Sequence, residues 1–317
     1  MKNKIFCTAL FILLINVIFA TNNKIEKQTF IFSVKGADTL RLDKYDNQSI
    51  LEEKPCVVFL FGGGFANGVR DNPDYNIYFT QLVNDGYVVV SIDYRLGLKN
   101  IQNNEDLNPE KVITSLNNAV SIAVEDLYDA TKYIVDRAKD WNINKNEIVA
   151  SGSSAGAITV LQGEYGISNQ IELTEKLPDN FNFAGVIAFA GAILGTNNDL
   201  TWKRKPAPIQ MFHGDADRNV PYAKLTYGSI GLYGSKYISE QMKALKFPYY
   251  FYDVENGAHE ISSTPMHQNL EEIKIFMDRF VIAKQSLIIN TQVTSTDKME
   301  VKKDFEIMDY LRTNFGK

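Results

Sequence analysis

A serine with glycines two residues before it and two residues after it is the feature of this sequence that most directly suggests chemistry. In "EIVASGSSAGA", Gly152 and Gly156 flank Ser154 in this way. Ser151 and Ser153 lack this spacing. A sharp strand-to-helix turn strains the serine backbone and crowds its neighbours, so it needs glycines at these two positions. Such a turn exposes the hydroxyl and predicts a nucleophile; the alternative is a glycine turn that only lets a helix pack on a strand.

A serine nucleophile needs a base, and the base needs a carboxylate that orients it. Among the three histidines, His259 in "NGAHE" is the expected base, because it directly follows a segment that suits a strand. His213 is expected to order its own turn by hydrogen bonds, and His267 to lie on a helix. In "HGDADRNVP", Asp217 is the expected carboxylate, whereas Asp215 is expected to order the turn.

Backbone N–H groups that can stabilise a developing oxyanion are expected at two places. One is Ala155, at the start of the helix that follows the serine. The other is "FGGGF", where Gly63 and Gly64 let the backbone approach a substrate with no Cβ in the way. A phosphate-binding or flexible loop is the alternative, but neither G-x-G-x-x-G nor a Lys-Ser/Thr ending is present. Since H-E-x-x-H, C-x-x-C and EF-hand patterns are also missing, neither a metal nor a cofactor is expected.

Strands that alternate with helices must position these loops. Apolar, β-rich segments predict strands at 56–61, 87–94, 147–151, 183–191, 207–214 and 249–254, preceded by an antiparallel pair at 29–34 and 39–45. Helices are predicted at 74–84, 115–139, 155–163, 236–246 and 265–284. This alternation predicts an α/β fold, with a mainly parallel sheet of about eight strands and helices on both faces. In such a sheet, functional loops lie at the carboxyl ends of the strands, which is where all the segments named above fall.

The chain resembles the α/β-hydrolase family, and within it the secreted carboxylesterase-like and lipase-like enzymes. The resemblance spans residues 56–281 and rests on "FGGGF", "SIDYRLG", "EDLYDATKYI", "GSSAG", "HGDADRNVP" and "GAHE". It implies an α/β-hydrolase fold, a catalytic triad made of Ser154, Asp217 and His259 in the family's chain order, and an oxyanion hole made of Gly63, Gly64 and Ala155. Many members have a histidine where this chain has Phe61, and this departure bears on loop geometry and substrate preference.

The resemblance implies a serine esterase that cleaves carboxylic esters through an acyl-enzyme, with a small-molecule or glycan ester as its substrate. Short-acyl, carbohydrate and phenolic esters are candidates by analogy. One alternative is a serine peptidase of the same fold that acts on short peptides, although such peptidases usually carry a propeller or a larger cap. Another is a non-catalytic binding module, which predicts the loss of a site residue. Loops 67–76 and 97–116 and the segment 194–205 are expected to shape the pocket.

The N-terminus predicts a secretory signal peptide over residues 1–20. Lys2 and Lys4 precede an apolar run, and Ile18 and Ala20 suit positions −3 and −1 of a cleavage site. Cleavage after Ala20 implies a secreted or periplasmic protein and leaves Cys56 without a disulfide partner; an uncleaved anchor is the alternative.

The remaining chain suits one catalytic domain over residues 21–284. The 317 residues are 45% hydrophobic, which is enough for a large core. The formal net charge of −5, without a basic block, argues against nucleic-acid binding. Residues 285–317 lie beyond the resemblance, and they are expected either to pack an extra strand and helix on the domain or to act as an interaction segment.

Overall fold

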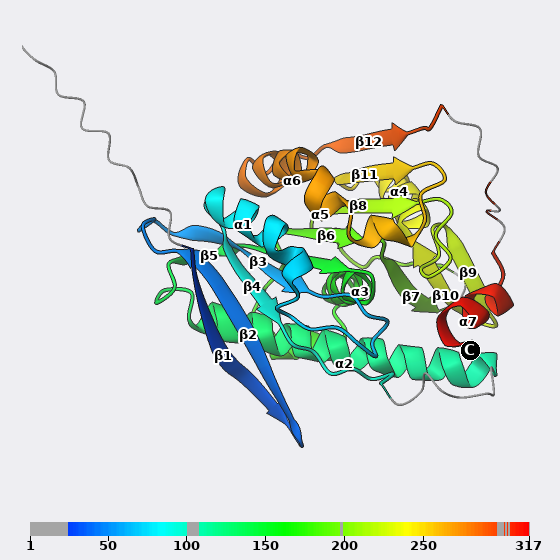
Figure 1. Cartoon of the computed structure of the whole chain (residues 1–317), viewed down its shortest axis with the longest axis horizontal. Coiled ribbons are helices and arrows are strands. Elements are labelled where there is room, and N and C mark those ends of the chain that lie inside the picture. The colour runs from blue at the N-terminus through cyan, green and yellow to red at the C-terminus, as the bar shows by residue number, and fades with distance from the viewer. Residues whose placement is uncertain are drawn as a thin grey trace, which may run out of the picture.

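The computed structural model describes residues 25–99, 108–196, 199–296, 301, 303 and 305–316, so the predicted signal peptide lies outside the described residues. A twisted nine-stranded sheet with helices on both faces organises the chain (Figure 1). Its strands are β1 (Ile25–Lys35), β2 (Asp38–Asn47), β3 (Lys54–Leu60), β4 (Val88–Ile92), β5 (Ile143–Ser153), β6 (Gly185–Phe189), β8 (Ile209–Gly214), β11 (Tyr249–Val254) and β12 (Ile288–Val293). They lie in the order β1-β2-β4-β3-β5-β6-β8-β11-β12. Every neighbouring pair from β4 to β12 is parallel, which confirms the predicted α/β class.

The helices follow the strands in the predicted alternation. They are α1 (Asn76–Asn84), α2 (Pro109–Asp136), α3 (Ala155–Asn169), α4 (Ser235–Ala244), α5 (Pro265–Gln268), α6 (Leu270–Phe276) and α7 (Ile307–Phe315). Shorter helical turns are η1 (Pro73–Tyr75), η2 (Glu172–Lys176), η3 (His259–Ser262) and η4 (Met277–Ile282). Within the described part of the chain, no helix combines the length and apolar character that crossing a bilayer requires.

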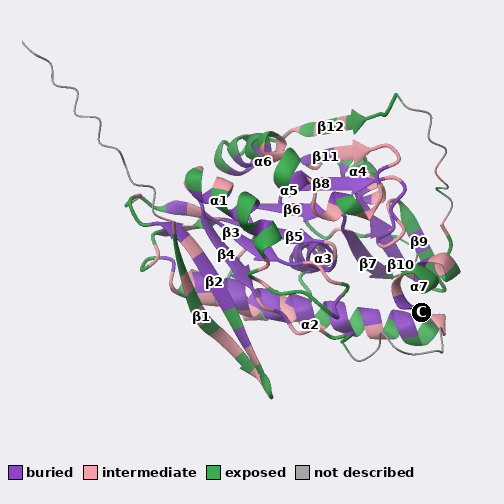
Figure 2. Cartoon of the chain, in the orientation of Figure 1, coloured by how far each residue is buried: buried purple, intermediate pink, exposed green. Residues whose placement is uncertain are grey.

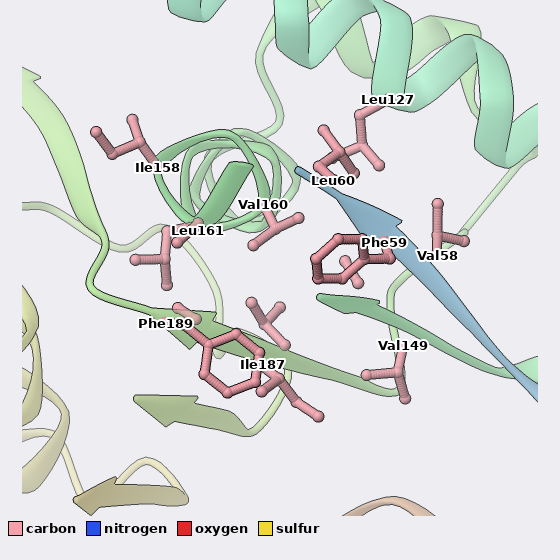
Figure 3. Packing of buried hydrophobic residues seen from close by; sticks show 14 of the residues in the cluster. Val58, Phe59, Leu60, Leu127, Val149, Ile158, Val160, Leu161, Ile187 and Phe189 are labelled. Atoms are coloured by element: carbon pink, nitrogen blue, oxygen red, sulfur yellow. The ribbon is translucent and has the colours of Figure 1, made fainter. Parts of the chain in front are cut away.

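The core lies on both faces of the central strands, which Figure 2 shows as buried along their length. Phe59 of β3 packs edge-on against Phe79 of α1, with 5.0 Å between the ring centroids. Figure 3 shows its neighbour Leu60 beside Leu127 of α2. Each such fully buried side chain stabilises the fold by roughly 1.5–3 kcal/mol. The continuous apolar runs of the sequence therefore form strands whose two faces both pack against helices.

Four features differ from the sequence prediction. The main sheet has nine strands rather than about eight, and a second sheet of β7 (Ala192–Thr196), β10 (Ile230–Gly234) and β9 (Lys224–Tyr227) was not predicted. Helix α2 begins six residues early, at Pro109, because the Asn108 side chain accepts the N–H groups of Glu110 and Lys111. The helix predicted over 265–284 is divided into α5, α6 and η4, since Asn269 leaves the helical region with φ −121° and ψ 35°.

The C-terminal segment packs on the domain. Strand β12 pairs in parallel with β11 along its full length, and α7 contacts α2 and β9. In Figure 1, β12 forms one edge of the sheet and α7 lies beside the N-terminal end of α2. Of the two expectations for residues 285–317, an extra strand and helix is therefore what the described residues form, and the sheet continues past residue 284.

Glu164 is a fully buried carboxyl group in α3. Its Oε1 accepts hydrogen bonds from the Ala207 backbone N–H (2.7 Å) and the Ser168 hydroxyl (3.3 Å). Its Oε2 has no hydrogen-bond partner in the described part of the chain. Burial raises the pKa of Glu164 from 4.5 to about 7, because removing the charged form from water outweighs the hydrogen bonds that favour it.

The free energy of unfolding is expected to contain a component from Glu164 that falls as pH rises from about 4.5 to about 7. In that window the native state holds a proton that the unfolded state has released, so raising the pH favours unfolding by at most about 1.4 kcal/mol per pH unit. Glu164→Gln removes this component. Urea unfolding should therefore show that the free energy of unfolding of the variant, relative to that of the wild type, is higher at pH 7.5 than at pH 5. Glu172→Gln, which changes an exposed carboxyl, is the matched control. If the free energies of unfolding of Glu164→Gln and the wild type differ by the same amount at both pH values, the prediction is contradicted.

Candidate active site

Ser154 lies on the predicted sharp turn between β5 and α3. Its backbone has φ 49° and ψ −113°, a region that costs a non-glycine residue about 1–3 kcal/mol. A Cβ on Gly152 would lie 2.4 Å from the backbone of Gly156, and one on Gly156 would lie 2.1 Å from the carbonyl oxygen of Leu60. Both positions therefore have to be glycine for the turn to form, as the spacing predicted.

The structure brings together the three side chains predicted for the triad. Ser154 Oγ lies 2.9 Å from His259 Nε2, and His259 Nδ1 lies 2.8 Å from Asp217 Oδ2. The Asp217 side chain is fully buried, whereas 26% of the His259 side chain is exposed. An imidazole held between a hydroxyl and a buried carboxylate can take a proton from the first while the second stabilises the resulting charge.

The Asp217 carboxylate is held on both oxygens. Its Oδ1 accepts the backbone N–H groups of Asn219 (2.8 Å) and Val220 (3.0 Å), which leaves Oδ2 to face His259. The Nε2 of His213 also lies 3.4 Å from Oδ2. Burial acts to raise the pKa of Asp217, but the two histidines outweigh it and hold that pKa well below its usual range. The carboxylate is therefore charged at neutral pH.

The competing residues have other partners. Asp215 accepts the backbone N–H of Asn256 (2.7 Å) and pairs with Lys303 (2.6 Å). His213 is fully buried and bonds through Nδ1 to Ser235 Oγ (2.8 Å) and through Nε2 to the Val220 carbonyl oxygen (3.2 Å). His267 lies exposed on α5. The proximity of His213 to Asp217 is a contact that sequence reasoning missed, although the two residues share one loop.

A cavity of about 500 Å³ opens at Ser154, within the size range of small-molecule sites. Gly63, Gly64 and Ala155 line it together with Ser154 and His259. Gly63 (φ 135°) and Gly64 (φ 62°) adopt conformations that favour glycine. The backbone N–H groups of Gly63, Gly64 and Ala155 meet no acceptor among the residues that the structure describes. They are thus available to an oxyanion.

Two of the three segments expected to shape the pocket do so. Segment 67–76 contributes Asn72 and Tyr75 to the cavity lining, and segment 97–116 contributes Leu98 and Leu116. No described residue of 194–205 lines it, which corrects that expectation. Trp202 of this segment packs edge-on against Tyr165 of α3 instead. Four lining residues come from α7, where the sequence offered no local signal for a role in the site.

Aromatic residues support the glycine loop at Phe61, the position where the resemblance suggests a histidine. Phe61 stacks on Tyr94 with 4.5 Å between the ring centroids, and the Tyr94 hydroxyl donates to the Phe61 carbonyl oxygen (2.8 Å). The hydroxyl of Tyr75 accepts the backbone N–H of Gly62 (3.2 Å). Packing and hydroxyl groups thus hold the start of the glycine loop.

Tyr75 also links this loop to the base. Its hydroxyl also interacts with the side chain of Ser153, whose Oγ donates to the carbonyl oxygen of Ser262 (2.8 Å). Ser262 ends the η3 turn that begins with His259. Polar contacts therefore join the glycine loop, the residue before Ser154 and the turn that carries the base.

Tyr75→Phe is expected to lower kcat about tenfold, because the Gly62 N–H loses its acceptor and one hydrogen bond is worth about 1 kcal/mol or slightly more. Tyr78→Phe is a matched control, since the Tyr78 hydroxyl bonds to Ser151 Oγ (3.0 Å) away from the cavity. The control should lower Tm without lowering kcat. Ester hydrolysis and thermal unfolding of both variants provide the measurements; equal kcat values would contradict a positioning role for Tyr75.

Comparison with known proteins agrees with this architecture. The BD-FAE family model, which describes an esterase-like α/β-hydrolase domain, matches residues 42–105. No curated protein matches the chain significantly. Among solved structures, esterase 2 of Thermogutta terrifontis is similar in its apo form, at 19% identity and a TM-score of 0.58 over 82% of this chain and 96% of that one.

Two further structures of the same esterase are equally similar. Its propionate-bound form and its form phosphonylated by cyclosarin each match at 19% identity and a TM-score of 0.58, over 82% of this chain and 95% of that one. The mainly parallel sheet and its flanking helices are thus arranged as in the fold of a known esterase. In its fold, a large and mainly parallel sheet flanked by helices, the chain thus matches an α/β-hydrolase esterase.

Proposed function

We propose that the protein is a serine esterase that cleaves carboxylic esters through an acyl-enzyme on Ser154. The observation that carries the proposal is the hydrogen-bonded series from Ser154 through His259 to Asp217 at a cavity of about 500 Å³. The fold shared with esterase 2, which has been studied with propionate bound and after phosphonylation, supports the same reaction class.

In the first half of the reaction, His259 Nε2 takes the proton of Ser154 as Oγ attacks the ester carbonyl carbon. The N–H groups of Gly63, Gly64 and Ala155 stabilise the negative charge that develops on the carbonyl oxygen. When the tetrahedral intermediate collapses, His259 donates its proton to the departing alcohol and leaves an acyl group on the serine.

In the second half, His259 takes a proton from water, and the resulting nucleophile attacks the acyl carbon. Collapse of the second tetrahedral intermediate breaks the bond to Ser154, which recovers its proton from His259 and releases the acid. Asp217 orients the imidazole throughout and stabilises its charged form.

The proposed substrates are esters of short acyl groups, with carbohydrate and phenolic esters as the natural classes suggested by analogy. We also propose that the protein acts outside the cytoplasm after cleavage of its predicted signal peptide behind Ala20. N-terminal sequencing of protein recovered from the periplasm or medium tests this proposal, and a retained leader would contradict it.

The activity is tested with p-nitrophenyl acetate and butyrate beside a panel of aminoacyl amides and short peptides. We expect hydrolysis of the esters and labelling of Ser154 by a fluorophosphonate probe. Faster hydrolysis of the amides would establish a peptidase instead. Folded protein that neither reacts with the probe nor hydrolyses any ester would point to a binding module and overturn the proposal.

A further inference from the structure

Helix α7 forms part of the cavity that contains Ser154, although it lies far from the site in sequence. Tyr310, Thr313, Asn314 and Phe315 all line this cavity. The same helix buries Tyr310, Leu311 and Phe315 against the domain. One helix thus packs on the core and contributes four residues to the substrate site.

Hydrogen bonds join α7 to the loop that carries Asp217. The Asn314 side chain donates to the Asn219 carbonyl oxygen (3.2 Å), and the Asn219 side chain donates back to Asn314 Oδ1 (3.4 Å). Arg218 pairs with Asp309 at 3.5 Å. A lone exposed ion pair contributes little, but these contacts together give α7 a defined position on the loop.

Packing also fixes the helix. Leu116 of α2 and Ile307 of α7 line one small apolar cavity together, next to β9 and β10. The side chain of Glu306 and that of Asp309 cap the first turn reciprocally. In Figure 1, α7 lies beside the N-terminal end of α2, where Leu116 is. The helix is therefore an ordered wall.

The cavity has apolar and polar lining residues, and α7 contributes to both groups, because Thr313 and Asn314 are polar. Leu98, Leu116 of α2, Ile158 of α3 and Phe315 of α7 are apolar. The polar residues Asn72, Asp74, Ser262 and Ser263 come from the segments around η1 and η3. An ester with an apolar acyl group and a polar alcohol suits a cavity that offers both kinds of lining.

The position of the base decides which part binds which group. His259 must reach the oxygen of the departing alcohol, and it begins the turn that also contains Ser262. The alcohol therefore lies toward η3 and its serines. We propose that the apolar lining residues, Phe315 of α7 among them, form the acyl subsite and that Phe315 sets the longest acyl chain it accepts; this inference rests on the proposed esterase function.

The test compares Phe315→Ala with Phe315→Trp across p-nitrophenyl esters from acetate to decanoate. The ratio of kcat/KM for octanoate to that for acetate should rise at least about tenfold in Phe315→Ala, because burying several extra methylene groups is worth more than 1.4 kcal/mol. In Phe315→Trp, the chain length of best activity should become shorter. Shifts in opposite directions cannot arise from unfolding.

Phe305→Ala is the matched control, since Phe305 packs on Tyr310 (6.2 Å between ring centroids) but does not line the cavity. It should leave the octanoate-to-acetate ratio unchanged. The same shift in Phe305→Ala as in Phe315→Ala, or no shift in either Phe315 variant, overturns the inference. A shift that appears in a series of acetate esters of different alcohols, and not in the acyl series, overturns the assignment to the acyl group.

A second readout needs no turnover. Octanoate should raise the Tm of Phe315→Ala more than that of the wild type, whereas acetate should affect both alike. Equal octanoate effects on the two proteins contradict the subsite. An inactive wild type that still shows this difference would separate failure of the proposed esterase function from failure of the acyl subsite.

Discussion

Replacing Ser154 with alanine lowers kcat for p-nitrophenyl acetate by about 10⁴-fold or more, the size of effect seen when a triad nucleophile is removed. The reason is that the substitution deletes only Oγ, the atom 2.9 Å from His259 Nε2. The backbone conformation at φ 49° is equally strained for alanine and serine, so the fold and Tm should hold. Activity and fluorophosphonate labelling are measured on protein whose circular dichroism matches the wild type.

Ser153→Ala provides the matched comparison, because it removes a neighbouring hydroxyl while leaving the nucleophile in place. Its Oγ donates a hydrogen bond to the carbonyl oxygen of Ser262, so a loss of about tenfold is expected, and labelling should persist. Variants of Ser153 and Ser154 with equal losses would contradict the assignment of Ser154 as the nucleophile. Near-wild-type activity of Ser154→Ala would by itself refute the assignment of Ser154 as the nucleophile.

The serine turn could be predicted from sequence because its constraints are local. Gly152 and Gly156 are required by backbone atoms within a few ångströms, and a spacing pattern records such requirements directly. The choice of Asp217 over Asp215 is also local, since Asp217 Oδ1 caps the N–H groups two and three residues ahead and so turns Oδ2 outward. Residues that are close in sequence can carry this information without an account of the whole fold.

The wall of the cavity could not be predicted in the same way. Phe315 reaches the site because β12 pairs with β11 and α7 then contacts α2, and both contacts join segments far apart in the chain. The short strands of the second sheet were missed because "KLTY" and "IGLYG" are too brief for a clear alternation. The early start of α2 did have a local signal, because in "NPE" an Asn cap precedes a proline at the first helical position. The predicted start did not use this signal.

Replacing Asp217 with asparagine lowers kcat by about 10³- to 10⁴-fold, a loss of the size that this change causes in serine hydrolases with a triad. Oδ1 accepts two backbone N–H groups, from Asn219 and Val220, so the amide oxygen of the new side chain takes that position. Its NH₂ group then faces His259 Nδ1 in place of Oδ2. The imidazole must accept at Nδ1 and carry its proton on Nε2, and in that tautomer it cannot take the proton of Ser154.

Asp215→Asn tests whether this loss is specific to the carboxylate that faces the base. The new side chain can still accept the Asn256 N–H through its oxygen, and it loses a partly exposed pair with Lys303 that is worth about 0–1 kcal/mol. Its kcat should therefore stay within about tenfold of the wild type. Because both variants remove one negative charge from the same loop, any large difference between them must come from the hydrogen bond to His259. Equal losses would instead assign the effect to the charge of the loop and contradict the proposed role of Asp217.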